Sequence, residues 1–345
     1  MGNPRRFYGC GESFELDGVV IPARCAVEVT FRTHQQRFLL RPDHRATETI
    51  LGCFGRALSR YPGLSILSLS VLSNHGCFVV IPDSPTSLSN FMRDFLSSTA
   101  VRLNRLRKRN GTFWERRYRA IPILDEAALE DRFAYVLTQG TKENLVWSAR
   151  DWPGVSSVAA LATGAPLIGR WRNWSREAEL RRQRKRKLDR ARRRKEQLTL
   201  PKVKPVYVEY EIPLAPLPHW AHLPSERRQQ LVSNIVDSDE QDTRKRHQRN
   251  GTRPAKAKAL KRTSPFRRPK ESKRTPAPRC HASRRELRRA FSCLYELVAA
   301  DLHSTTEHSE ELKKVAKEVS GLRETLQKQD TSSSTTADAH GGRKE

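Results

Sequence analysis

The chain has 345 residues, which is enough for one or two domains, but its composition argues against a single compact body. Hydrophobic residues make up 37%, charged residues make up 30%, and the formal net charge is +27. Such an excess of positive charge opposes compaction and attracts polyanions, so nucleic acid is the first partner to expect. We expect no membrane partner, because the most apolar stretch, residues 64–81, is interrupted by serines and by Asn74-His75.

The cysteine spacing and the N-terminal sequence indicate the cellular compartment to expect. The chain has no CxxC pair, and its six cysteines are too widely spread for a disulfide framework, which favours a reducing compartment. The first fifteen residues contain no apolar segment typical of a secretory signal. We therefore expect a cytoplasmic protein that is associated with the nucleoid.

Composition shifts sharply near residue 165 and divides the chain into parts. Before this point apolar residues recur in regular patterns, and after it basic and Pro-rich segments dominate. We expect those segments to be largely disordered, because they cannot bury enough apolar area to offset the entropy of the chain. The predicted parts are an N-terminal extension at 1–19, a folded domain at 20–165, a basic, Pro-rich linker at 166–282, an amphipathic helical segment at 283–328 and a disordered tail at 329–345.

The folded part is expected to alternate strands and helices in a definite order. Alternating β-branched residues predict strands, and apolar residues on one face after a capping residue predict helices. The order β-α-β-β-α-β-α is the split βαβ plan, so we predict an α+β, ferredoxin-like fold with an antiparallel sheet and helices on one of its faces. The predicted elements are a strand at 25–33, a helix from 43 or 44 to 61, strands at 64–72 and 76–81, a helix at 87–106, a strand at 119–124 and a helix from 125 to 139.

Two apolar stripes follow the basic region near the end of the chain. Their spacing alternates between three and four residues, and both stripes share one heptad register. This pattern predicts amphipathic helices and a possible coiled-coil homodimer, and the alternative is a helix that packs on the main domain. The stripes are Leu287, Phe291, Leu294 and Val298, and then Leu312, Val315, Val319, Leu322 and Leu326.

Residues that could act in a reaction or bind a metal lie on two of the predicted elements. His75 and Cys77 alternate along the second strand of the hairpin, which places them on one face of the sheet. Tyr135 and Gln139 are four residues apart in a predicted helix, so they share a helix face one turn apart. Taken singly, Tyr135 is most simply a half-buried helix aromatic, and Cys77 is a small buried strand residue.

Basic residues offer two candidate contacts to nucleic acid. The segment 113–118 (FWERRY) and the arginine after it combine aromatic rings with positive charge, a pattern that holds single strands, although its aromatics are more often core residues. Residues 181–195 hold eleven Lys or Arg among fifteen, and such a run repels itself in isolation, which favours nucleic-acid contact over a merely solvated helix. The candidates are Trp114, Arg116, Arg117, Arg119, Arg181, Arg182, Arg184, Lys185, Arg186, Lys187, Arg192, Arg193, Arg194 and Lys195.

Over roughly residues 20–160 the sequence resembles the single-tyrosine HUH transposases, in particular the REP-associated tyrosine transposases. No single piece is specific, but the order and spacing of the pieces together are. In chain order the pieces are FRTHQQRFLLRP, SNHGCFVV, LSNFMRDFLSSTAVRLNR, FWERRYRAIPI, YVLTQ and ENLVWSARDWPGVSS.

The resemblance implies a DNA-handling domain that acts on single-stranded or hairpin DNA. In that family two histidines that flank a hydrophobic residue bind a divalent metal, here Mg²⁺ or Mn²⁺, and a helix tyrosine attacks a phosphodiester to give a 5′-phosphotyrosine. The resemblance assigns the nucleophile to Tyr135 and metal ligands to His75 and Gln139. The second histidine falls on Cys77, and the middle position falls on Gly76, which are departures. Cysteine suits zinc better than Mg²⁺ or Mn²⁺.

Two functions of different classes follow from this resemblance. The first is a transposase that cleaves and transfers DNA strands, as in the transposition and recombination of a mobile element. The second is a domesticated nucleic-acid-binding protein of the same fold whose metal site has decayed, which the replacement at Cys77 supports. RNA binding is a third, weaker possibility, because the same fold plan serves RNA recognition but no aromatic RNP pattern is present.

Overall fold

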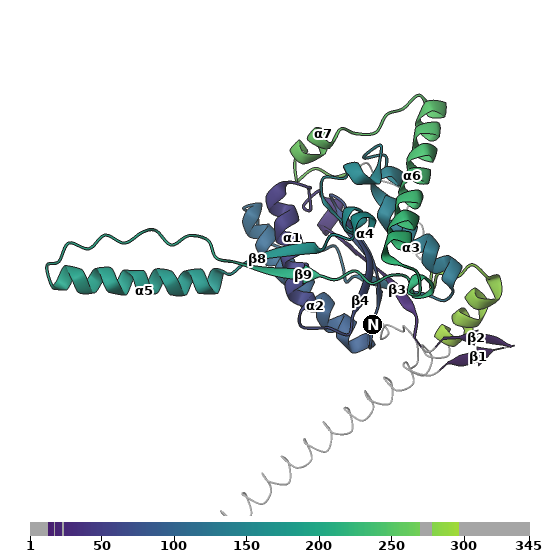
Figure 1. Cartoon of the computed structure of the whole chain (residues 1–345), viewed down its shortest axis with the longest axis horizontal. Coiled ribbons are helices and arrows are strands. Elements are labelled where there is room, and N and C mark those ends of the chain that lie inside the picture. The colour runs from purple at the N-terminus through teal and green to yellow at the C-terminus, as the bar shows by residue number, and fades with distance from the viewer. Residues whose placement is uncertain (1–12, 17, 23, 270–277, 297–345) are drawn as a thin grey trace, which may run out of the picture. The chain divides into compact units, whose positions relative to one another are not determined.

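A five-stranded sheet forms the centre of the computed structural model, which describes residues 13–16, 18–22, 24–269 and 278–296. The strands lie in the order β6-β3-β5-β4-β7, and every neighbouring pair is antiparallel (Figure 1). The first four strands follow the split βαβ order, so the predicted α+β, ferredoxin-like fold is confirmed. The strands are β3 (Ala26–Arg32), β4 (Ser65–Val71), β5 (His75–Ile81), β6 (Arg119–Ile123) and β7 (Val155–Ser156).

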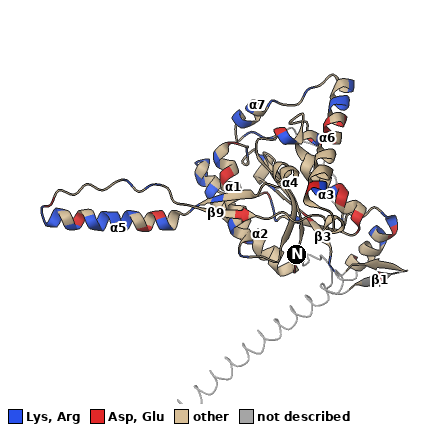
Figure 2. Ribbon diagram, in the orientation of Figure 1, with Lys and Arg blue, Asp and Glu red and all other residues tan. Residues whose placement is uncertain are grey.

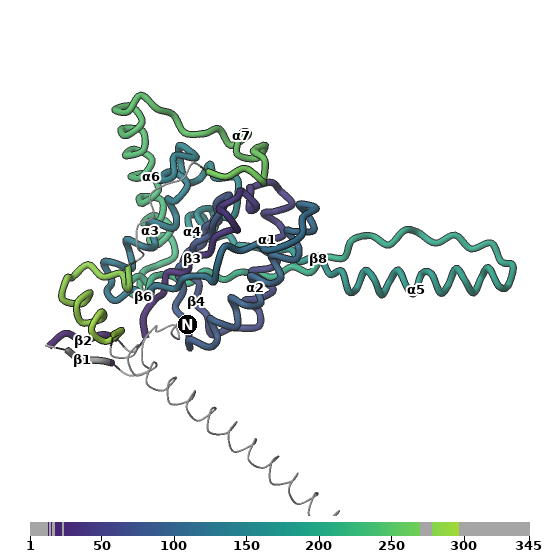
Figure 3. Tube along the Cα trace, turned by 180° about the vertical axis from the view of Figure 1, so that it is seen from behind, coloured from purple at the N-terminus to yellow at the C-terminus, as the bar shows by residue number. Residues whose placement is uncertain are grey.

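Helices cover both faces of this sheet. On β3, Val27 and Val29 pack in the cluster that includes α1 (His44–Leu58) and α2 (Pro85–Leu106), whereas Ala26 packs in the cluster that includes α3 (Glu126–Lys142) (Figures 1 and 3). The prediction that the helices lie on one face is therefore wrong. Its physical reason is that β4 and β5 carry apolar side chains on each face, with Leu67 and Val79 on one face and Leu69 and Phe78 on the other, so both faces must be covered to exclude water.

Each of the three main helices begins after a capping side chain, although the second was predicted to begin at residue 87 and begins at Pro85. Asp43, Ser84 and Asp125 each accept a hydrogen bond from the backbone N–H three residues later, at 3.1, 3.1 and 2.8 Å. These bonds satisfy N–H groups that the first turn of a helix leaves without partners. The boundaries of the three main helices are thus encoded locally.

The expectation of a largely disordered linker at 166–282 is wrong for most of that range. The structure places two strands and three α-helices there, namely β8 (Leu167–Arg172), α5 (Trp174–Arg193), β9 (Tyr207–Ile212), α6 (Ser225–Asn250) and α7 (Ala257–Arg262), together with a short 3-10 helix at Pro218–Trp220. Residues 270–277 lie outside the described residues. A few apolar residues are enough to hold this segment in place because they pack into the core. Val232 and Val236 of α6, for example, belong to the buried cluster that also contains residues of α3.

The β8–β9 hairpin packs closely on α1. A Cβ added at Gly52 of α1 would overlap the carbonyl group of Arg170, and one added at Gly169 would overlap that of Leu51. Two facing glycines therefore let the hairpin backbone approach the helix backbone directly, much as small residues do wherever backbones approach closely. This contact explains why a segment with so little hydrophobic sequence is ordered.

A long basic arm projects from the β8–β9 hairpin (Figures 1 and 2). It comprises residues 173–206, that is α5 and the chain that returns along it, and we call it the basic arm. Glu177 is only 2% exposed and ties together the two ends of the basic arm. It accepts hydrogen bonds from Arg172 at 2.7 and 2.9 Å and from the backbone N–H of Val206 at 3.1 Å. Farther out, Arg184 donates to the carbonyl oxygens of Leu200 and Pro201 at 2.8 and 2.9 Å.

The remaining elements are short. A two-stranded pair, β1 (Phe14–Leu16) and β2 (Val19–Ile21), falls in or next to the predicted N-terminal extension, and α4 (Val158–Thr163) follows β7. Residues 285–296 are helical, in line with the first apolar stripe up to Leu294, whereas Val298, the second stripe, the coiled coil and the tail lie outside the described residues. In the part of the chain that is described, no helix is long and apolar enough to cross a bilayer.

Candidate active site and nucleic-acid interface

The sheet face beneath α3 brings together the residues that the sequence singled out. His75 begins β5, and its Nε2 lies 2.9 Å from Nε2 of Gln139 on α3. Gln139 is only 2% exposed, whereas Tyr135 is half-buried one turn earlier and packs against the core cluster that contains Cys77. β5 and α3 therefore face each other at this point, with the imidazole and the Gln139 amide in direct contact.

The hydrogen bonds of His75 define the form of its ring. Nδ1 lies 2.8 Å from Oδ1 of Asn74, an oxygen that can only accept, so Nδ1 carries the proton and Nε2 accepts from the Gln139 amide. Burial, and then the nearby charge of Arg32, lower the pKa of His75 to about 4. At neutral pH the imidazole is therefore uncharged and presents its Nε2 lone pair to Gln139.

We expect His75 to make folding stability depend on pH between about 4 and 6.5. Because the pKa is lowered to about 4 from 6.5, the unfolded chain binds the proton first as the pH falls. The contribution of His75 to the free energy of unfolding is then fully present above pH 6.5 and is lost as the pH falls toward 4, by up to about 3 kcal/mol. Urea unfolding at pH 4.5 and 7 measures the change. A His75→Gln variant should remove about one proton from the slope, and equal slopes in both proteins would contradict this prediction.

Tyr135 sits between positive side chains on its own helix. The Arg132 guanidinium lies 4.8 Å, and the Lys142 ammonium 5.2 Å, from the centre of its ring. Burial raises the pKa of the Tyr135 phenol, and the nearby Cys77 and Glu28 add to this effect. The phenol is thus protonated at neutral pH, while two cations flank the place where a phosphate would approach it.

Cys77 is engaged with a buried carboxylate. Its Sγ donates to Oε1 of Glu28 at 3.1 Å, and the other oxygen of Glu28 lies 2.5 Å from Nε2 of His281. Burial raises the pKa of the Cys77 thiol well above its usual value, and the Glu28 carboxylate raises it further. Burial also opposes ionisation of Glu28, but the contacts with His281 and Cys77 outweigh it and lower the pKa of Glu28. Cys77 is therefore a protonated hydrogen-bond donor.

Gly76 has a steric reason for being small. It lies opposite Phe31 in the β3–β5 register, and a Cβ at Gly76 would overlap the Phe31 ring. That ring makes edge-to-face contacts with Phe95 and Trp114 at 5.5 and 5.4 Å. The hydrophobic group expected at the middle position is thus supplied by Phe31 of the neighbouring strand.

The residues at this site fit a divalent cation in part. No group of three or more His, Cys, Asp or Glu side chains is placed to hold a metal within the residues described. The Nε2 lone pair of His75 is neutral but accepts from the Gln139 amide, so a cation would reach it only if that amide turned its Oε1, which is buried without a hydrogen-bond partner, toward the same point. Mg²⁺ usually keeps several waters and takes few protein ligands, so the amide oxygen of Gln139 suits it, whereas the imidazole of His75 suits it less and the protonated Cys77 does not.

Arginines from two strands lie beside His75. Arg32 lowers the pKa of His75, and partial burial together with Arg116 and Arg32 lowers the pKa of Arg119, so these three cations are close to one another. Arg119 begins β6 and pairs with Thr30 of β3, and Arg116 is exposed. Of the predicted contacts in this segment, Arg116 and Arg119 therefore border the candidate site.

Trp114 serves the core. It is half-buried, its indole N–H donates to the carbonyl oxygen of Leu96 at 2.9 Å, and its ring packs edge-on against Phe31 and Phe113. Phe113 and Tyr118 are also buried, at 3% and 7% exposure. The core interpretation of these aromatics holds, and we do not propose Trp114 as a base-stacking residue.

The basic run predicted at 181–195 forms the outer part of α5 and the first residues after it (Figure 2). All of its predicted contact residues are exposed except Arg184, which is half-buried and bonded to the returning chain. The structure thus presents these cations on an ordered helix that is separate from the sheet site.

Sequence reasoning missed several residues of the site. Arg132 and Lys142 lie three residues before and seven residues after Tyr135, a helical spacing that could have revealed them. Asn74 directly precedes His75. Glu28 and His281 carry no such signal, because the chain after Cys280 returns to β6 through a backbone contact that no local pattern encodes.

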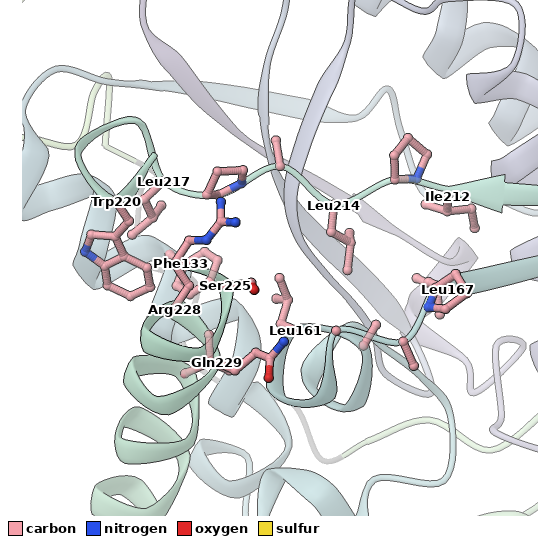
Figure 4. A pocket seen from close by; sticks show the side chains of 18 of the residues that line it. Phe133, Leu161, Leu167, Ile212, Leu214, Leu217, Trp220, Ser225, Arg228 and Gln229 are labelled. Carbon is pink, nitrogen blue, oxygen red and sulfur yellow. The ribbon is translucent and has the colours of Figure 1, made fainter. Parts of the chain in front are cut away.

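A separate pocket of about 440 Å³ lies among α3, α4, α6 and the chain after β9 (Figure 4). Figure 4 shows that Phe133, Leu161, Leu217 and Trp220 line it with apolar side chains. Its lining includes neither Tyr135 nor His75. We assign it no part in the chemistry of the site.

Comparisons with known proteins give structural likeness only. No family model and no curated protein matches the chain. A solved structure of a REP-associated tyrosine transposase bound to a REP hairpin is 16% identical, with a TM-score of 0.37, over 48% of this chain and 87% of that one. A crystal structure described as a candidate transposase from Deinococcus radiodurans is 12% identical, with a TM-score of 0.26, over 38% of this chain and 96% of that one. With TM-scores this low, neither likeness assigns a function to this chain.

Proposed function

We propose that this protein binds single-stranded or hairpin DNA in the manner of a transposase, and that Tyr135 attacks a phosphodiester of that DNA. The single observation that carries this proposal is the meeting of Tyr135, Gln139 and His75 on one sheet face, beside cations from β3, β6 and α3. A nucleophile, a neutral imidazole and several arginines are what displacement at a phosphate requires.

Binding is supported by the charge that the fold displays. The basic arm carries eleven Lys or Arg between residues 181 and 195, and Arg32, Arg116 and Arg119 lie at the candidate site. Neutralising DNA phosphates with such side chains releases counterions and favours binding without reading sequence. The arm and the site therefore offer two contact regions to one DNA molecule, as expected for a protein that holds a hairpin stem and a single strand.

The proposed reaction exchanges one phosphodiester for another. The Tyr135 oxygen bonds to phosphorus, the bond to the 3′ oxygen breaks, and the tyrosine proton ends on that oxygen, which leaves a 5′-phosphotyrosine and a 3′-hydroxyl. Arg132 and Lys142 hold the phosphate near the phenol. His75 and Gln139 would hold a Mg²⁺ or Mn²⁺ ion, which neutralises charge on the non-bridging oxygens when bound.

A second candidate is a DNA-binding protein of this fold that no longer cleaves. The observation that favours it is the hydrogen bond from Cys77 to Glu28, because this position belongs to the second metal histidine in the family that the sequence resembles. A thiol that is protonated and already engaged removes one ligand from the site.

One experiment separates the two candidates. The protein is incubated with end-labelled hairpin DNA and Mg²⁺ or Mn²⁺, and an SDS-resistant protein–DNA adduct is sought while binding is measured in parallel. A metal-dependent adduct supports cleavage. Salt-sensitive binding without an adduct supports the second candidate, and the absence of any DNA binding contradicts both.

A Cys77→His variant sharpens the result, with Cys77→Ser as the matched control. If an adduct forms only in Cys77→His, the natural protein is a binder with a decayed site. If the wild type and both variants form it equally, position 77 takes no part in the reaction. Thermal unfolding of each variant shows whether the larger side chain is accommodated in this fully buried position.

A further inference from the structure

An open pocket of about 660 Å³ lies where the C-terminal end of α6 meets the loop after α3. Trp147 of this loop lines it and is 38% exposed, which is the highest exposure of any tryptophan in the described residues. Arg246 of α6 donates to the carbonyl oxygen of Thr141 at 2.9 Å and so fixes the two elements together. A solvent-facing indole in a hollow is an available stacking surface.

His247 supports this indole from within the protein. The imidazole is 4% exposed, its ring centre lies 5.2 Å from that of Trp147, and the two rings meet at 68°. Its Nδ1 is 2.7 Å from Oγ1 of Thr252, whereas its buried Nε2 has no hydrogen-bond partner. Buried polar atoms are normally paired, so this nitrogen keeps an unused hydrogen-bonding position at the pocket lining.

The rim supplies polar groups that are not committed elsewhere. Arg244 is paired with Glu240 at 2.6 Å, but the side chains of Asp151 and Arg253 make no hydrogen bond or ion pair with any other described residue. The backbone turns at Gly251 with a φ of +59°, and a Cβ there would meet no atom within 4 Å, so the pocket is open on this side. An aromatic face, one free carboxylate and one free guanidinium complement the ring and the polar edge of a nucleobase.

The pocket is placed to serve the candidate site. Tyr135 and Lys142 are seven residues apart on α3, which is roughly 10 Å along the helix axis. Trp147 follows shortly after the end of this helix, and α6 is bonded to its last turn through Arg246 and through the contact between Thr141 and Asp239. The proposed nucleophile and the pocket are therefore carried by one helix and the loop that follows it.

We propose that this pocket binds one unpaired base of single-stranded DNA, which stacks on Trp147 and contacts Asp151, Arg253 and His247 at its edge. This inference rests on the proposed function, because it gives the protein a base-binding subsite for the same DNA strand that Tyr135 is proposed to attack. The subsite would set which nucleotide lies at the reacting phosphate.

The test measures how a single-stranded oligonucleotide binds in EDTA when one abasic site is moved along it. In the wild type one abasic position should weaken binding about tenfold, since stacking of one base contributes on the order of 1–3 kcal/mol. Trp147→Ala should weaken binding of the intact strand to a similar extent and should lose the sensitivity to that position. Trp147→Phe, which keeps an aromatic face, should retain most of both effects.

Phe266→Ala is the control, because Phe266 is an exposed aromatic outside the pocket, at 47% exposure, and its replacement should leave both measurements unchanged. If Trp147→Ala binds like the wild type, or keeps the full abasic effect, the pocket is not a base subsite although the proposed function stands. If the wild type binds no DNA, both proposals fail. If it binds an RNA strand of the same sequence more tightly, the assignment to DNA is overturned.

Discussion

Replacing Tyr135 with phenylalanine should abolish the covalent DNA adduct while leaving DNA binding within about twofold of the wild type. The phenol oxygen is the proposed nucleophile, and its loss removes the only atom of this side chain that can bond to phosphorus. We expect the rate of adduct formation to fall on the order of 1000-fold or more. The ring itself remains, so its contacts with Arg132 and Lys142 and its packing beneath the sheet are kept.

The matched control is Tyr207→Phe. Tyr207 begins β9, is 38% exposed, and has the Arg170 guanidinium 4.6 Å from the centre of its ring, so it resembles Tyr135 in its surroundings but lies away from His75. Its replacement should leave adduct formation unchanged. An adduct that persists at the wild-type rate in Tyr135→Phe would remove Tyr135 from the reaction, whatever the wild type binds.

Removing the basic arm should produce the largest change in DNA affinity. The β8–β9 hairpin is paired from Leu167–Ile212 to Arg172–Tyr207, so residues 173–206 can be replaced with the two-residue turn Asn-Gly. We expect affinity for hairpin DNA at low salt to fall about 100-fold or more. If about six of the eleven cations contact phosphate, the slope of log K against log salt should become less steep by roughly 4 to 5. Titrations between 50 and 200 mM salt measure both quantities.

A second variant keeps the arm and removes part of its charge. Arg182, Lys185, Arg186, Arg193 and Lys195 are exposed, and their replacement with glutamine leaves the anchoring contacts of Glu177 and Arg184 in place. It should reproduce much of the loss in affinity and in salt dependence. A protein without the arm that keeps the full salt slope would show that its DNA contacts lie elsewhere.

The two expected results concern separable parts of the molecule. Tyr135 belongs to a site beneath the sheet, and the arm is an insertion between two strands of a hairpin that packs on α1. Loss of the phenol should therefore change the reaction and spare binding, whereas loss of the arm should change binding and spare the reaction at saturating DNA. Effects that appear together in both variants would mean that the arm delivers DNA directly to Tyr135.

The helix starts and strands that the sequence predicts rest on local signals, namely capping residues and the alternation of apolar residues. Asp43 and Asp125 mark helix starts through bonds to backbone three residues away, and alternation in the second half of β4 marks a strand, whereas the start capped by Ser84 was predicted two residues late. Such signals act over a few residues, so they survive without knowledge of the rest of the chain. The shared faces of His75 with Cys77 and of Tyr135 with Gln139 are of the same kind, because they follow from the periods of a strand and a helix.

Only the tertiary structure decided which distant groups meet. The sequence by itself determined the α+β fold order, the positions of Tyr135, Gln139 and His75 on their elements, and the excess of basic charge. It did not determine that Glu28 accepts a hydrogen bond from the Cys77 thiol and contacts His281. The contact with His281 joins β3 to a segment more than 250 residues later in the chain, which no local pattern encodes. Nor did composition reveal an ordered arm, since its order comes from backbone packing at Gly52 and from one buried carboxylate, Glu177, rather than from hydrophobic content.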